Sequence, residues 1–200
     1  MQPIDAPVSG GSVKALAGKM TIMASGDPKA FERAAPALDA IAGKVFRLGD
    51  TPGLGSQVKM VNQLLAGVHI AATAEAMTLG AKIGIDLQQL HEVICECAGS
   101  SWMFENRGAH IVAGDYTPHS AVDIFVKDLG IVASEAGKAG CNTPLTSAAL
   151  ALFQQASAAG LGREDDSAVV KILAASAKVD LPGVGLPGVD LPEVTTADTR

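Results

Sequence analysis

The sequence predicts mixed α and β structure, with a small α/β part followed by a long helix and an all-helical domain. Residues 1–52 alternate short apolar runs with glycine turns and one helical stretch, whereas residues 53–175 show helical periodicity throughout. The composition is 48% hydrophobic but only 4% aromatic, which favours helices packed closely on small side chains. Residues 176–200 carry a five-residue repeat rich in proline and glycine, which predicts a disordered tail.

The first part reads as strand, turn, strand, helix, strand. The first strand runs straight into Ser9-Gly10-Gly11, a turn that brings backbone amides close to a ligand. Pro36 lies inside the helix and predicts a kink or a break there. Three strands leave sheet edges and one face uncovered, so this part is too small to stand alone as a domain. We expect strands at Ile4–Val8, Met20–Ala24 and Lys44–Leu48, and a helix that begins at Asp27 and Pro28.

The long helix begins after the glycine turn at Gly53, and Ser56 is the expected N-cap. Lys59 and Asn62 lie one turn apart, so that they present an ammonium and an amide side by side. Apolar residues at spacings of three and four predict one buried stripe along this helix. The stripe comprises Val58, Val61, Leu65, Val68, Ala72, Ala76 and Leu79.

Helix start and stop signals divide the rest of the chain into five further helices. Acidic residues, serine or proline stand at the expected starts, and glycines stand at several of the expected ends. The expected helices run from Asp86 to about Ala98, from Ser101, from Pro118–Ser120 to Gly140, from Thr143-Pro144 to Gly160, and from Asp165-Asp166 through Leu173.

Charge and composition exclude several classes of function. The net charge of −6 and the lack of a basic run argue against a nucleic-acid partner. The longest apolar stretch is shorter than the ~20 residues of a membrane span, and the first residues do not resemble a signal peptide, so we expect a cytoplasmic protein. The three cysteines and four histidines show no spacing typical of a metal site, and we expect none.

Three motifs in register resemble those of the β-hydroxyacid dehydrogenases. They are residues 5–11 with Ser9-Gly10-Gly11, residues 53–62 with Lys59, and Phe125-Val126-Lys127-Asp128-Leu129. The resemblance covers residues 4 to 173 and implies that the first part is the C-terminal remnant of a Rossmann-type domain. The segments at 101–107 and 114–128 are most similar to the L-threonate dehydrogenase branch of the family.

The resemblance implies NAD-dependent oxidation of a small hydroxy acid, with NADP as the other candidate cofactor. Lys59 is then the general acid/base, because a lysine in a dry pocket has its pKa lowered toward working pH. The resemblance further implies that Ser9, Gly10 and Gly11 hold the substrate carboxylate. It also implies that Asn62 and Gln63 hold the substrate or the lysine, and that Lys127 and Asp128 approach the cofactor.

Alternatives follow from the substrate and from the missing part of the family pattern. The substrate alternatives are 3-hydroxyisobutyrate and 2-hydroxy-3-oxopropionate, although Ser120 favours a polar sugar acid. Family members begin with strand, GxGxxG and helix, whereas this chain starts at the last strands of that domain. A catalytically inactive fragment that serves only as a helical association module is therefore the rival hypothesis. In either case the uncovered sheet and the alanine-rich helices predict a homo-oligomer.

Overall fold

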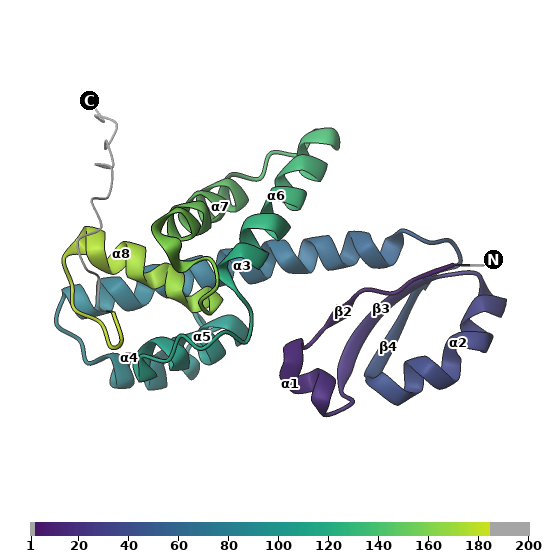
Figure 1. Ribbon diagram of the computed structural model, residues 1–200, viewed down its shortest axis with the longest axis horizontal. Helices are drawn as coiled ribbons and strands as arrows, with labels where there is room; N and C mark the ends of the chain where they lie inside the picture. Colours follow the sequence, from purple (N-terminus) through teal and green to yellow (C-terminus); the bar gives the residue numbers. More distant parts are fainter. Residues whose placement is uncertain (1–2, 185–200) are drawn as a thin grey trace.

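The computed structural model describes residues 3–184 as a small sheet with two helices, joined by one long helix to a bundle of helices (Figure 1). The long helix, α3 (Leu54–Lys82), runs from the sheet through the middle of the bundle. In this view β2 (Val8–Ser9) and α1 (Gly11–Leu16) lie beneath it. The elements of the first part are β1 (Ile4–Asp5), β2 (Val8–Ser9), α1 (Gly11–Leu16), β3 (Met20–Gly26), α2 (Pro28–Ile41) and β4 (Ala42–Gly49).

The sheet is built on β3, which is the apolar strand expected at Met20–Ala24. β4 pairs with one edge of β3 in parallel, while β1 and β2 pair antiparallel with the other edge. The single strand expected at Ile4–Val8 is therefore interrupted after Asp5. Ile22 and Ala24 of β3 are buried against Phe31 of α2, which forms a small core separate from that of the helical bundle.

α2 continues through Pro36 as one helix, so of the kink or break expected at this proline, the break does not occur. Asp27 caps its start, accepting hydrogen bonds from the amides of Lys29 and Ala30. Phe31 before the proline and Leu38 after it both pack on the sheet. Burial of both halves of the helix on one surface offsets the hydrogen bond that the proline removes.

The first turn of α3 (Leu54–Lys82) is capped by the sheet and not by Ser56, whose expected role as N-cap is wrong. The Asp5 carboxylate accepts hydrogen bonds from the amides of Gly53 and Ser56, at 3.0 and 2.8 Å, and from the Ser56 hydroxyl at 2.6 Å. Ser25 of β3 accepts from the amide of Gly55. Burial acts to raise the pKa of Asp5, but the hydrogen bonds from Ser56 and Gly53 hold this pKa below its usual value.

Gly55 allows this junction to close, and we expect Gly55→Ala to destabilise the protein. A Cβ at Gly55 would lie 2.4 Å from the Met23 carbonyl oxygen and 2.9 Å from that of Asp5, and backbone atoms do not move aside as a flexible side chain does. Overpacking of this kind costs about 1–3 kcal/mol, measured as the free energy of unfolding in urea.

Gly137→Ala is the matched control, because Gly137 lies inside a helix and a Cβ there meets nothing within 4 Å. It should raise the free energy of unfolding by about 0.5–1 kcal/mol. Equal effects of the two substitutions would contradict the close contact at Gly55.

The buried face of α3 differs from the predicted stripe. Val58, Val61, Leu65 and Leu79 of that stripe are exposed. The helix is apolar nearly all round, and its small residues decide which side is buried because they let neighbouring helices approach. The buried residues are Gly55, Ala66, Gly67, Ile70, Thr73, Ala74, Met77, Thr78 and Gly80.

By length and composition alone, α3 could cross a membrane, since its most apolar window has a mean hydropathy of 1.3. Half of that window is buried within the chain. Four helices of the bundle all pack against it, which is the arrangement of a core helix in a globular domain. They are α5 (Trp102–Ala113), α6 (Val122–Lys138), α7 (Pro144–Ala156) and α8 (Val170–Ala177).

The helical bundle forms as the capping signals predict. Asp86, Ser101 and Asp165 each accept a hydrogen bond from a backbone amide at the start of their helices. The expected inward face of α6, from Val122 to Ala136, is buried. The elements are α4 (Leu87–Cys95), α5 (Trp102–Ala113), α6 (Val122–Lys138), α7 (Pro144–Ala156), η1 (Ser157–Leu161), η2 (Asp166–Val169) and α8 (Val170–Ala177).

The first repeat of the expected disordered tail is packed on the bundle. Leu181 is 6% exposed, and the Tyr116 hydroxyl donates a hydrogen bond to the carbonyl of Pro182 at 3.2 Å. Gly114 and Gly183 approach so closely that a Cβ at Gly183 would lie 2.4 Å from the Gly114 oxygen. The expected disorder is therefore wrong for residues 179–183, and the later repeats lie outside the described residues. The division at residues 52 and 175 stays a prediction of the domain boundaries.

Candidate active site

Five of the predicted site residues are brought together where α6 crosses α3. Lys59, Asn62 and Gln63 share one side of α3, and Lys127 and Asp128 reach them from α6. Asn62 donates its amide to Gln63 at 3.0 Å, and Gln63 donates to Asp128 Oδ2 at 2.6 Å. The Lys127 ammonium lies 2.9 Å from Asp128 Oδ1. A continuous polar chain thus joins the two helices beside Lys59.

Lys59 is half-buried at this crossing, and its surroundings change its acidity. Burial lowers the pKa of Lys59 below its usual value, the Asp128 carboxylate acts in the opposite direction, and the Lys127 ammonium lowers it further. The net effect is a lowered pKa, so a larger fraction of neutral amine is present near neutral pH than on an exposed lysine. A neutral amine is able to accept a proton.

Ser9, Gly10 and Gly11 form the turn between β2 and α1. Gly10 has a φ of +142° and Gly11 a φ of +63°, so both positions favour glycine. Ser9 pairs with Thr21 of β3, which ties the turn to the sheet. The turn therefore belongs to the sheet side of the molecule, whereas Lys59 belongs to α3.

Sequence reasoning missed two features of this region. Asp5 was not singled out, although it anchors the start of the lysine-bearing helix, because the 51 positions between it and Ser56 leave no local pattern. The contact from Gln63 to Asp128 was also missed, because the 65 positions that separate the two residues leave no local pattern.

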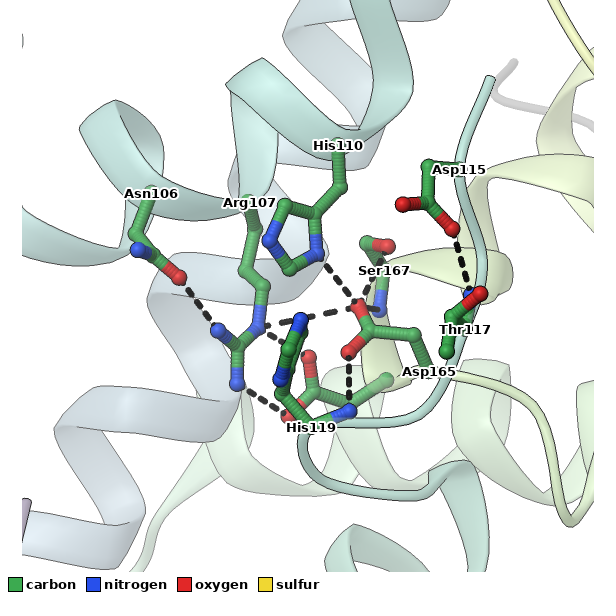
Figure 2. A network of polar contacts seen from close by, with 9 residues as sticks. Asn106, Arg107, His110, Asp115, Thr117, His119, Asp165 and Ser167 are labelled. Atoms are coloured by element: carbon green, nitrogen blue, oxygen red, sulfur yellow. Dashed lines mark hydrogen bonds and ion pairs between the residues drawn. The ribbon is translucent and has the colours of Figure 1, made fainter. Parts of the chain in front are cut away.

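A second polar network lies between α5 and η2 (Figure 2). Arg107 is 7% exposed and forms a two-pronged ion pair with Asp166, whose side chain is fully buried. Asp165 accepts hydrogen bonds from the Ser167 hydroxyl and the His119 amide, and His110 Nδ1 lies 3.1 Å from it. Burial acts to raise the pKa of Asp165, but the bond from Ser167 and the charge of Arg107 hold it below its usual value. This network joins α5, the 114–121 loop and η2.

Among residues 3–184, no cluster of three or more histidine, cysteine or acidic side chains is suited to a metal ion. The three cysteines are free thiols.

Two family models match the chain. Residues 53–173 match the model described as the NAD-binding part of NADP-dependent 3-hydroxyisobutyrate dehydrogenase. Residues 1–49 match the NAD-binding domain of 6-phosphogluconate dehydrogenase.

Curated relatives and solved structures agree with these matches. L-threonate dehydrogenase of Escherichia coli (strain K12) is 61% identical over 183 residues, covering 92% of this chain and 60% of the relative. A crystal structure of 3-hydroxyisobutyrate dehydrogenase from Salmonella typhimurium matches with a TM-score of 0.81 and 62% identity, over 84% of this chain and 59% of that one. A Mycobacterium tuberculosis 3-hydroxyisobutyrate dehydrogenase structure with L-serine matches with a TM-score of 0.76 and 32% identity, over 85% and 60% of the two chains.

The chain spans about 60% of the length of the L-threonate dehydrogenase that it matches. The family model that matches residues 53–173 covers more than half of the chain. Together with the sheet remnant, the long helix and the helical bundle, this match shows that the chain belongs to the NAD-binding family of the 3-hydroxyisobutyrate dehydrogenases.

Proposed function

We propose that the protein oxidises a small hydroxy acid, an L-threonate-like sugar acid, by hydride transfer to NAD with Lys59 as general base. The observation that carries this proposal is the half-buried Lys59 with its lowered pKa, held beside Asn62, Gln63 and Asp128. The 61% identity to an L-threonate dehydrogenase supports the choice of substrate.

The chemistry assigned to Lys59 is a single proton transfer. As the carbon-bound hydrogen leaves as hydride, the Lys59 amine takes the proton of the substrate hydroxyl, and a carbonyl forms. In the reverse direction the ammonium returns the proton. Asn62 lies one turn from the lysine and orients the hydroxyl with its side-chain amide.

Ser9, Gly10 and Gly11 are proposed to bind the substrate carboxylate. Amides in a turn with positive φ angles present donors to an anion, and this turn precedes the first turn of α1. The serine hydroxyl adds a further donor. The tie to β3 keeps these donors in place without the substrate, which reduces the entropy lost on binding.

NAD is the proposed cofactor, with NADP as the alternative, and when bound it supplies the hydride acceptor. The side chains at the α3–α6 crossing fit the reactive end of this cofactor. Lys127 and Asp128 lie beside the proposed base and pair with each other, which leaves the Lys59 amine available. Asp128 has a side-chain exposure of 14% and Lys127 one of 67%, so the pair faces solvent on the Lys127 side, where a ligand is able to approach.

A panel of hydroxy acids tests the proposal. The purified chain is incubated with NAD or NADP and with L-threonate, 3-hydroxyisobutyrate or L-serine, and reduced cofactor is followed by absorbance. We expect L-threonate to be preferred. Equal rates on 3-hydroxyisobutyrate and L-threonate would overturn the substrate assignment, and no reduction with any acid would favour the association module.

The exposed stripe of α3 favours a homo-oligomer. Val68, Ala72 and Leu79 line a groove of about 450 Å³ together with Leu145 and Leu152 of α7, and Glu75 is the one charged residue in its lining. An apolar surface of this kind favours association with a second copy of the chain, since symmetric dimers are the commonest assembly. Sedimentation is expected to give a dimer or larger, and a monodisperse monomer contradicts it. Three free thiols fit a cytoplasmic location.

A further inference from the structure

The carboxylate of Asp128 has both of its oxygens occupied by neighbours other than Lys59. Gln63 of α3 donates to Oδ2 at 2.6 Å, and the Lys127 ammonium lies 2.9 Å from Oδ1. Asn62 in turn donates to Gln63 Oε1 at 3.0 Å, which fixes the orientation of the Gln63 amide. Asp128 is therefore held at two points, one on each helix.

Lys59 lies four residues before Gln63, so the two side chains leave the same face of α3 one turn apart. The Asp128 charge acts on Lys59. Within residues 3–184, however, the ion pairs shorter than 4 Å do not include Lys59 with any carboxylate. A carboxylate that was free to turn would pair with a nearby ammonium, because charge-assisted hydrogen bonds are the strong ones.

We propose that Gln63 is a positioning residue, which holds Asp128 on the α3–α6 contact and away from Lys59 so that the amine stays unpaired. This inference rests on the proposed role of Lys59 as base, and it gives Gln63 a task other than binding substrate. A glutamine suits the task because its amide stands one methylene further from the backbone than that of an asparagine, and so spans to α6.

The electrostatic consequence follows from the charged groups around Lys59. Asp128 and Lys127, both from α6, are the charges that act on it. On the sheet side, the Asp5 carboxylate is bound by the amides of Gly53 and Ser56 at the start of α3. If Asp128 turned into contact with Lys59, the charged form of the lysine would be favoured and its pKa would rise. Gln63 thus preserves the neutral amine.

The pH dependence of Lys59 labelling by trinitrobenzenesulfonate, read by mass spectrometry, tests the inference without substrate or turnover. We expect Gln63→Leu to reduce labelling of Lys59 below its titration midpoint by about tenfold, as for a rise of one pKa unit. Gln63→Asn keeps the amide but is too short, and it should shift labelling in the same direction. It also serves if the leucine variant folds poorly, which urea unfolding will reveal.

A double substitution shows whether Gln63 acts through Asp128. Asp128→Asn should increase labelling, and the Gln63→Leu/Asp128→Asn variant should match Asp128→Asn alone. Unchanged or increased labelling in both Gln63 variants overturns the proposal. The proposal is also overturned if Gln63→Leu changes labelling as much in the Asp128→Asn background as it does in the unmodified chain. If labelling responds as expected while Lys59→Ala leaves turnover unchanged, Gln63 has the positioning role and Lys59 is not the base.

Discussion

Replacing Lys59 by alanine is expected to lower turnover of L-threonate by about 10²–10⁴-fold, the usual contribution of a general acid or base. The variant loses the amine that is proposed to take the hydroxyl proton. The rate of the unmodified chain should also increase with pH as the ammonium deprotonates, starting below the usual lysine range because burial lowers the pKa of Lys59. Steady-state formation of reduced cofactor across pH measures both effects.

Lys138→Ala is the control for loss of a lysine. Lys138 lies at the end of α6, where it pairs with Glu135 with a side-chain exposure of 69%. Its removal should leave turnover unchanged. A Lys59→Ala variant that retains full turnover with unchanged folding excludes Lys59 as the base.

Replacing Arg107 by methionine is expected to reduce the free energy of unfolding by about 3–5 kcal/mol, since it leaves buried charge without a partner. Both Asp165 and Asp166 have side-chain exposures of 0%, and Arg107 is the cation that faces them both. Urea denaturation of the purified variant measures the loss.

Two further variants separate the ion pair from simple loss of packing. Arg107→Met with Asp166→Leu should recover much of the loss, because apolar residues often replace a buried ion pair at little cost. Lys138→Met breaks an exposed pair and should cost no more than about 1 kcal/mol. If the double variant is less stable than Arg107→Met alone, the unpaired charge is not the cause.

The order of elements was predictable from the sequence because the signals for their starts are local. Asp27, Asp86 and Ser101 each accept a hydrogen bond from a backbone amide two or three residues further along the chain. The cap of α3 was not predictable in this way, because Asp5 lies 51 positions before Ser56. The buried side of α3 also escaped prediction. On a helix that is apolar on most sides, the close approach of neighbouring helices decides which face is buried. The spacing of apolar residues does not predict that face.

The candidate site was predictable in two unequal parts. The spacing of Lys59, Asn62 and Gln63 places them together on any helix, so their grouping follows from the sequence. Lys127 and Asp128 read as a surface pair, and only the family resemblance joined them to the site. Their meeting with Gln63 depends on the crossing of α3 and α6. Gly67 allows that crossing to be close, since a Cβ at this position would lie 2.8 Å from the Leu129 side chain.

The hydrogen bonds between Asp5 and the start of α3 connect the two parts of the proposed site, the Ser9 turn and the helix that carries Lys59. Ser9 lies four residues after Asp5, and Lys59 lies three residues after Ser56, whose amide and hydroxyl bind that same carboxylate. Ser9 of the turn proposed to bind the substrate carboxylate and the proposed base Lys59 thus both lie within four residues of the hydrogen bonds between Asp5 and Ser56. The hydrogen bonds of Asp5 therefore fix where the helix that carries Lys59 begins relative to the strand segment that leads into the Ser9 turn.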